Sequence, residues 1–367
     1  MADLSPQPLS APPKWFTDYV SADHSLLAYE QALSSPSRRE LWKYTSATKV
    51  VALTELATRR PAIAGGQHPG IEISEQPGDD ITALFNIAQA PEAFATLCRN
   101  PLLYVRVSKS LDQPLNIRHT ASSWPIVIDV AAGVAFTITE EFDSDNDQQQ
   151  VIWLRLGRDA QVTHARNSLS ATPQHWQFLS VQIQANGYYR LHNHAVASPL
   201  RRQDIQIQLC GDGASAELCG AAMIDARHLL DQQITVEHVS GHTTSQQNFH
   251  NIVADRGQST FNGRIHMHES ARKSNANLSN KNIGLGNNST INTKPELEIY
   301  NDDVSCAHGA TIGRLDDSQL FYLCSRGVSP SAARQLLCEG FLQQCVGGPL
   351  ADSANQGLLK PLQKLDI

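Results

Sequence analysis

The chain has 367 residues, of which 41% are hydrophobic and 18% are charged, and its formal net charge at pH 7 is −7. This length exceeds the needs of one small core and allows two or three structural regions. Lysine and arginine do not gather into the basic face that a nucleic acid or an anionic membrane surface requires. No apolar stretch approaches the roughly 18 residues of a transmembrane helix, and the first residues do not resemble a secretory signal. We therefore expect a cytoplasmic protein without a nucleic-acid or membrane partner.

Residues 1–100 are mixed in character, with several short segments whose apolar spacing favours helices. The clearest of these helices is Pro91–Cys98, because proline is well tolerated in the first turn of a helix. Gly65 and Gly66 mark a loop before it. The first hundred residues are therefore predicted to form a helix-leaning N-terminal region.

Residues 101–312 consist of short runs rich in β-branched and aromatic residues, separated by Gly, Asn, Asp or Ser. The runs are LLYVRV, LNIRH, IVIDV, AFTIT, VIWLRL, WQFLSVQI, YYRLHN, IQIQL, ITVEHV, GRIHMH and LEIY. This pattern excludes an alternating strand–helix fold and leaves a sandwich, a barrel, a propeller or a β-solenoid. The acidic stretch from Glu140 to Asp147 is interpreted as a solvated loop.

An asparagine-rich stretch favours the solenoid among these folds. Seven asparagines occur between Asn275 and Asn292. Stacked coils place equivalent turn residues above one another, where asparagine amides form hydrogen-bonded ladders and tolerate left-handed backbone angles. A polar surface loop explains the same composition, and there is no strict repeat period to decide between the two.

Residues 313–367 return to helical patterns. Two helices are predicted, the first capped by Asp316 or Asp317 and ending at Cys324, the second capped by Ser329 and beginning at Pro330. An apolar stripe follows one face of the second helix: Ala333, Leu336, Leu337, Phe341 and Cys345. Such a stripe is usually directed at the core and can also dock a partner. The polar tail after Gly347 is expected to fray.

Neither a disulfide framework nor a nucleotide site is evident. The seven cysteines are odd in number and irregularly spaced, and no CxxC pair occurs that would hold a redox centre or a stable iron–sulfur cluster. No Gly-Lys dipeptide occurs, which excludes the phosphate-binding GxxxxGK[ST] loop. If ATP drives the function of this protein, another subunit must hydrolyse it.

Histidine is abundant, with fourteen residues, and two pairs have a spacing of two. In a strand, His192 and His194 share one face, as do His266 and His268, so each pair could bind a transition metal. The simpler interpretation is that each pair faces solvent opposite apolar neighbours. His238 lies close in sequence to Thr243 and Ser245, where a hydrogen-bonded coil is favoured over a nucleophile–base pair.

Cys306 and His308 form the most specific candidate for a metal site. Residues two apart in extended backbone share a face, so a thiolate and an imidazole could address one metal ion. Gly309 follows directly and leaves room for another backbone. Two ligands cannot saturate iron or zinc, so this would be half a site, completed by a second chain. By spacing alone, a buried cysteine beside a structural histidine explains the pattern better. The neighbouring Asp302-Asp303 pair is interpreted as a turn.

The segments PELEIYNDDVSCAHGATIG (295–313) and DSQLFYLCSRG (317–327) resemble the SufB/SufD family, in its SufD-type form. LWKYT (41–45), HVSGHTTSQQNFHNIV (238–253) and STFNGRI (259–265) follow the same family. The resemblance implies a mainly β fold, a right-handed parallel β-helix between helical N-terminal and C-terminal regions. It further implies a non-enzymatic scaffold that builds nascent iron–sulfur clusters together with SufB and the ATPase SufC. SufC would dock on the C-terminal helices, and SufB would pair through the C-terminal coils.

The resemblance also assigns residues. SufB-type sequences have a cysteine where our alignment places Ser289, and they have a glutamate at the position of Gly309, so this chain lacks the sulfur-accepting cysteine of SufB. His308 matches the SufD histidine that shares the cluster site with SufB, and Cys306 matches a family cysteine of less certain role. No cofactor is expected to be bound stably, only a transient iron–sulfur cluster or iron.

Two other interpretations compete with this one. A carbohydrate-active β-helix enzyme would need an acidic groove on one exposed face. A purely structural subunit would carry His308 incidentally. The sequence leaves open whether the chain forms homodimers without SufB, and whether Cys306 or either histidine pair contributes to a metal site.

Overall fold

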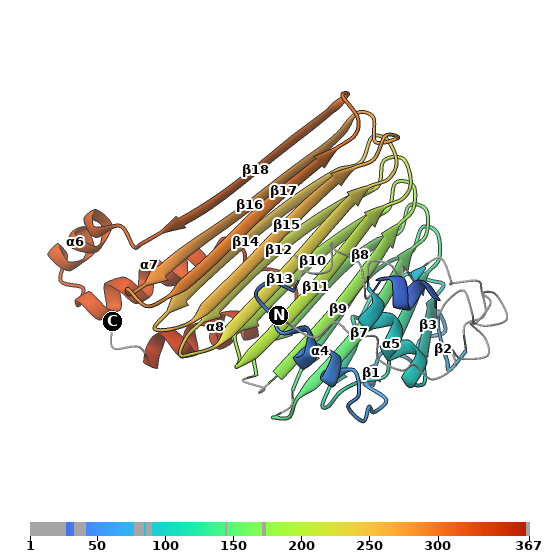
Figure 1. Ribbon diagram of the computed structural model, residues 1–367, viewed down its shortest axis with the longest axis horizontal. Helices are drawn as coiled ribbons and strands as arrows, with labels where there is room; N and C mark the ends of the chain where they lie inside the picture. The colour runs from blue at the N-terminus through green and yellow to red at the C-terminus, as the bar shows by residue number, and fades with distance from the viewer. Residues whose placement is uncertain are drawn as a thin grey trace.

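The computed structural model describes residues 27–32, 42–76, 84–85, 90–143, 145–170 and 174–364. Within them, two nine-stranded sheets account for every strand and lie face to face (Figure 1). From edge to edge, the first sheet contains β1 (Ala62–Ala64), β4 (Leu115–His119), β6 (Ala135–Phe142), β8 (Gln161–Ser168), β10 (Tyr188–Val196), β12 (Ser215–Ile224), β14 (Thr244–Ala254), β16 (Ser274–Leu285) and β18 (Val304–Gly313). The second contains β2 (Ile71–Ser74), β3 (Leu103–Val107), β5 (Ile126–Val130), β7 (Gln148–Leu156), β9 (Gln174–Ile183), β11 (Leu200–Leu209), β13 (Leu229–His238), β15 (Gln258–Met267) and β17 (Thr290–Ile299).

The chain crosses from one sheet to the other after each strand, and strands of the same sheet pair in parallel from β3 and β4 onward. In the first sheet Tyr188 lies beside Ser215, which in turn lies beside Thr244, so one coil takes just under thirty residues. The predicted parallel β-helix is therefore confirmed. The two short strands β1 and β2 come from the region predicted to lean towards helix, and each pairs antiparallel with the first coil.

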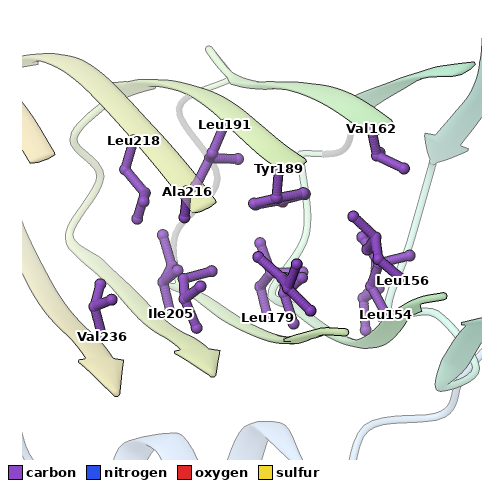
Figure 2. Close-up of a cluster of buried hydrophobic side chains, with 14 of the residues drawn as sticks. Leu154, Leu156, Val162, Leu179, Tyr189, Leu191, Ile205, Ala216, Leu218 and Val236 are labelled. Atoms are coloured by element: carbon purple, nitrogen blue, oxygen red, sulfur yellow. The ribbon is translucent and has the colours of Figure 1, made fainter. Parts of the chain in front are cut away.

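The core lies between the two sheets. Because side chains alternate along a strand, every second residue points inward. Leu179 and Ile205 of the second sheet face Leu191 and Leu218 of the first, and all four are buried (Figure 2). Each fully buried side chain of this size contributes about 1.5–3 kcal/mol relative to an exposed one. Stacking of like residues from coil to coil therefore holds the β-helix together.

Further along the same strands the interior becomes polar. Gln203 donates from Nε2 to Oε1 of Gln177 (2.6 Å) and accepts from Asn193 (2.9 Å) and Gln232 (3.1 Å). All four side chains are buried. A row of amides that bond to the coils before and after them fixes the register of the coils, because a slip would leave buried amides without partners.

The N-terminal helices cover the outer face of the second sheet. α4 (Ala47–Leu53) and α5 (Pro91–Arg99) pack against Trp153 and Phe178. The helix predicted at Pro91–Cys98 is thus confirmed and is one residue longer. The segment before α4 is held by the Arg202 guanidinium, which lies 3.9 Å from the centre of a Trp42 ring.

The C-terminal helices are α6 (Asp317–Ser325), α7 (Pro330–Gln343) and α8 (Ala351–Lys364) (Figure 1). Asp316 and Ser329 cap the first two, as predicted. The expected fraying after Gly347 is wrong, because Leu358 and Leu362 of α8 are buried against the outer face of the first sheet. No helix in the described ranges is long and apolar enough to cross a membrane.

The asparagine-rich stretch is not a stack of turns, which corrects one expectation. Four of its asparagines belong to strand β16, and Asn287 and Asn288 alone lie in the following turn. Asn280 and Asn282 point into the β-helix, where Nδ2 of Asn282 donates to Oδ1 of Asn280 (2.6 Å). These residues extend the polar interior towards the last coil.

Candidate functional site

The last coil leaves one end of the β-helix open. β18 is the edge strand of the first sheet and β17 the edge strand of the second, so within the described chain each has one neighbour only. The register places Cys306 beside Ala276 and His308 beside Leu278, both of which are buried core residues. Cys306 and His308 therefore share the inward-directed face of β18, as the spacing predicted, and no further coil of the described chain lies above them.

Cys306 and His308 differ in exposure. Cys306 is half-buried and packs against the core, and burial raises the pKa of its thiol. His308 is exposed, and no described residue makes a hydrogen bond or an ion pair with its ring. A Cβ added to Gly309 would meet no described atom within 4 Å. The exposed imidazole is thus accessible to another molecule, and on the opposite face of β18 Gly309 leaves room for another backbone.

Apolar side chains surround this open end. Ile299 at the end of β17 is 46% exposed, Tyr300 is 60% exposed and Ile312 on β18 is 58% exposed. Unpaired strand edges together with exposed apolar residues are a template for pairing with another chain.

Ser289 lies away from His308. It is next to Gly284, which also lies next to the carbonyl of Gly313 at the end of β18. His308 is five residues earlier on that strand, a distance of about 17 Å at 3.3 Å per residue. The two positions are therefore not brought together within this chain. Asp302 and Asp303 form the bend between β17 and β18, in which the Asp303 amide donates to Oδ1 of Asn301 (2.9 Å).

The pair His192 and His194 lies on the outer face of β10, remote from the last coil. His194 is buried, and its Nδ1 is 2.8 Å from Oδ1 of Asn167. Burial, together with a smaller effect of the neighbouring His192, lowers the pKa of His194 to about 4. The ring of His192 packs on Gly347 and Gly348. These imidazoles join the C-terminal helices to the β-helix instead of facing solvent.

His266 near the end of β15 and His268 directly after it alternate with the buried Ile265 and Met267, as the simpler interpretation had it, and both imidazoles are half-buried. The two rings stack with their centroids 4.1 Å apart. Burial lowers the pKa of His266, and so do His268 and Arg264. Among the residues that the structure describes, no group of three or more potential ligands is arranged to hold a metal ion.

His238 is a structural residue, as predicted. Its Nδ1 is 2.7 Å from Oγ1 of Thr243 and its Nε2 is 2.8 Å from Oγ of Ser245. Burial lowers the pKa of this imidazole to about 3. A neutral ring with both nitrogens satisfied holds the turn between β13 and β14 in place and has no free nitrogen for catalysis.

The sequence did not indicate a buried charge cluster inside the first coils. Glu140, expected in a solvated loop, is fully buried and accepts from Nε2 of His119 (3.0 Å), Nε2 of His164 (3.1 Å) and Nε of Arg166. Burial alone would raise the pKa of Glu140, but Arg166 and the two imidazoles hold it well below its usual range. Glu140 is buried because it is an inward-directed residue of β6, and its hydrogen-bond partners lie on the neighbouring strands.

These features define a parallel β-helix with an uncapped end that presents a thiol and an imidazole. Residues 115–341 match the family model described as "SUF system FeS cluster assembly, SufBD core domain". The chain belongs to this family.

Curated relatives agree with the family. The iron–sulfur cluster assembly protein SufD of Escherichia coli is 30% identical over 250 residues, which cover 66% of this chain and 57% of that protein. A SufBD family protein of Synechocystis is 31% identical over 59% of this chain and 51% of its own length. The chloroplastic protein ABCI7 of Arabidopsis thaliana is 30% identical over 58% and 46%, respectively. The chain thus spans about half the length of the curated relatives it matches. None of these matches supports the alternative of a carbohydrate-active enzyme.

Proposed function

We propose that this chain is a SufD-type, non-enzymatic scaffold subunit in the cytoplasm, which joins SufB through its open end and helps to assemble nascent iron–sulfur clusters there. The proposal rests on one combined observation: the chain matches the SufBD core domain, and it carries an exposed histidine, His308, on its last, uncapped strand. Strand edges and apolar residues at that end favour a second β-helix as the partner.

His308 supplies a ring nitrogen to iron in this proposal, and Cys306 is a second, weaker candidate. Imidazole and thiolate are ligands that iron accepts. The raised pKa of the Cys306 thiol keeps it protonated at neutral pH unless a metal or a partner displaces the proton. Two ligands do not complete the coordination of iron, so SufB would contribute the remaining ligands. Iron and the cluster are cargo that passes through the site.

The ATPase SufC would dock on α6 and α7. Phe321 and Tyr322 of α6 are 75% and 57% exposed, and Leu336 of α7 is 51% exposed although its helical stripe was expected to face the core. A shallow pocket of about 380 Å³, lined by Tyr322, Leu323 and Leu337, lies between the two helices. Exposed apolar side chains around a pocket are typical of a protein-docking surface.

The test is His308→Ala in the full chain, co-expressed with SufB and SufC. We expect the purified complex to form and to contain at least several-fold less iron and acid-labile sulfide than the wild-type complex. His228→Ala is the matched control, because it removes an imidazole that lies in the turn before β13 and pairs with Asp225 (3.1 Å), away from the last coil. Unchanged iron and sulfide in the His308→Ala complex would refute the role of His308. A stable homodimer without SufB would show that a second copy can occupy the same edge.

A further inference from the structure

A polar pocket of about 230 Å³ lies next to the open end, on the side of the second sheet. Tyr44, from the segment before α4, forms one wall. The other walls come from β13, β15, β17 and the last strand: Gln233, Thr260, Phe261, Asn262, Ile291, Asn292, Thr293, Lys294 and Ile312. Neither the iron site nor the SufC surface uses these residues.

Three oxygen atoms in the walls have no hydrogen-bond partner within the described chain, namely Oε1 of Gln233, Oγ1 of Thr260 and Oδ1 of Asn262. Thr260 is 3% exposed and Gln233 is 8% exposed. The amide of Gln233 has a defined orientation, because its Nε2 donates to the carboxylate of Asp231 (2.7 Å), which can only accept. A buried acceptor without a partner is costly, so these atoms favour a ligand that donates hydrogen bonds.

The wall formed by Tyr44 is held in place from both sides. The adjacent Thr45 donates from Oγ1 to Oδ2 of Asp231, and Arg202 links the same carboxylate (2.9 Å) to the ring of Trp42. These partners are buried. A pocket with walls fixed in this way costs little conformational entropy to occupy.

The charges near the pocket are compensated. Lys294 pairs with Glu296 at 2.5 Å, and Asp231 pairs with Arg202. A neutral group that donates hydrogen bonds therefore suits the pocket better than a cation or an anion. A carboxamide supplies two N–H donors from one small planar group, and its own oxygen can accept from Lys294 or Tyr44.

The pocket opens at the edge that the partner must reach. Ile291 and Thr293 lie on one face of β17 and Asn292 and Lys294 on the other, and all four line the pocket. Since β17 is an edge strand and Ile312 belongs to the edge strand of the other sheet, the pocket borders the open end itself. An occupant carried by the partner can therefore enter as the two β-helices join.

We propose that this pocket receives an asparagine or glutamine side chain from the partner β-helix, so that Thr260, Asn262 and Gln233 help to select the partner and its register. The inference rests on the proposed association through the open end. It adds the N-terminal segment around Tyr44 to the interface, although that segment is remote from β17 in sequence.

The test compares Thr260→Val and Asn262→Leu in the full chain for binding to SufB, measured by isothermal titration calorimetry. Each substitution removes an unpartnered acceptor, so we expect the thermal midpoint of the free chain to stay equal or rise. The affinity for SufB should fall at least ten-fold with Asn262→Leu and several-fold with Thr260→Val. Thr235→Val, a half-buried threonine on the outer face of β13, is the control and should not change affinity. A merely structural role would lower stability and leave affinity unchanged.

A further variant distinguishes failure of the pocket from failure of the association. Ile299→Lys places a charge at the far end of β17 from the pocket and should abolish binding if the open end is the interface. If Ile299→Lys abolishes binding while both pocket variants bind like wild type, the pocket inference is overturned and the association stands. If Ile299→Lys binds normally, the association is overturned and the pocket inference with it.

Discussion

The buried cluster around Glu140 gives the sharpest prediction for stability. Glu140 and Arg166 are fully buried within the β-helix, and the guanidinium of Arg166 donates to the carboxylate. Glu140→Gln keeps the size of the side chain but leaves the Arg166 charge in the interior without its counter-charge. Removing one partner of a buried ion pair costs about 3–5 kcal/mol. We expect the free energy of unfolding to fall by that amount.

The measurement is urea unfolding of the full chain at pH 7.5, followed by circular dichroism. Glu217→Gln is the matched control, because Glu217 pairs with Arg190 at the surface, where such a pair contributes about 1 kcal/mol or less. Since the folded-state pKa of Glu140 is lowered, its contribution is present above the unfolded pKa of about 4.3 and is lost as pH falls towards the folded value. A Glu140→Gln variant within 1 kcal/mol of wild type would refute the reasoning.

Three further predictions follow from packing and burial. Gly220→Ala places a Cβ 2.4 Å from the Phe249 ring and should cost about 1–3 kcal/mol in urea unfolding; an unchanged midpoint would contradict it. The pKa of about 3 for His238 means that its folded form stays neutral while the unfolded form gains a proton below about pH 6.5. Wild type should therefore lose about 2 kcal/mol from this group between pH 6.5 and 5.0, and His238→Gln should show a shallower decline over that range. Leu358→Ala should release α8 at a cost of about 2–5 kcal/mol, seen as faster hydrogen exchange confined to the C-terminal helices; uniform exchange across the chain would argue against local release.

The strands that could be predicted are those with alternating apolar residues, such as Ile126–Val130 and the VIWLRL run in β7. β8, β12, β14, β16 and β18 are absent from the predicted runs because their inward positions carry mostly polar or small residues, for example His164 in β8 and Ala216 in β12. Such strands are stabilised by parallel neighbours almost thirty residues away in sequence, which a local pattern does not contain.

Part of the candidate site was predictable because it, too, depends on a local alternating pattern in the sequence. Period-two spacing put Cys306 and His308 on one face, and the family resemblance gave that face a meaning. The buried position of Glu140 and the placing of Tyr44 and β17 around one pocket were not predictable, because both depend on which segments become neighbours in the fold. The stripe on α7 was partly right, because Ala333 is buried whereas Leu336 is 51% exposed.

The position of Cys306 and His308 on the terminal coil has a consequence for cooperativity. In a solenoid each coil contacts only the coils before and after it, so stability is close to a sum of nearest-neighbour terms. The final coil has one such neighbour within the described chain, whereas an inner coil has two, so separating the final coil disrupts fewer contacts between coils. The candidate site thus belongs to a unit that can open while the remaining coils stay folded, and in the proposed function such opening would let cargo enter and leave without global unfolding.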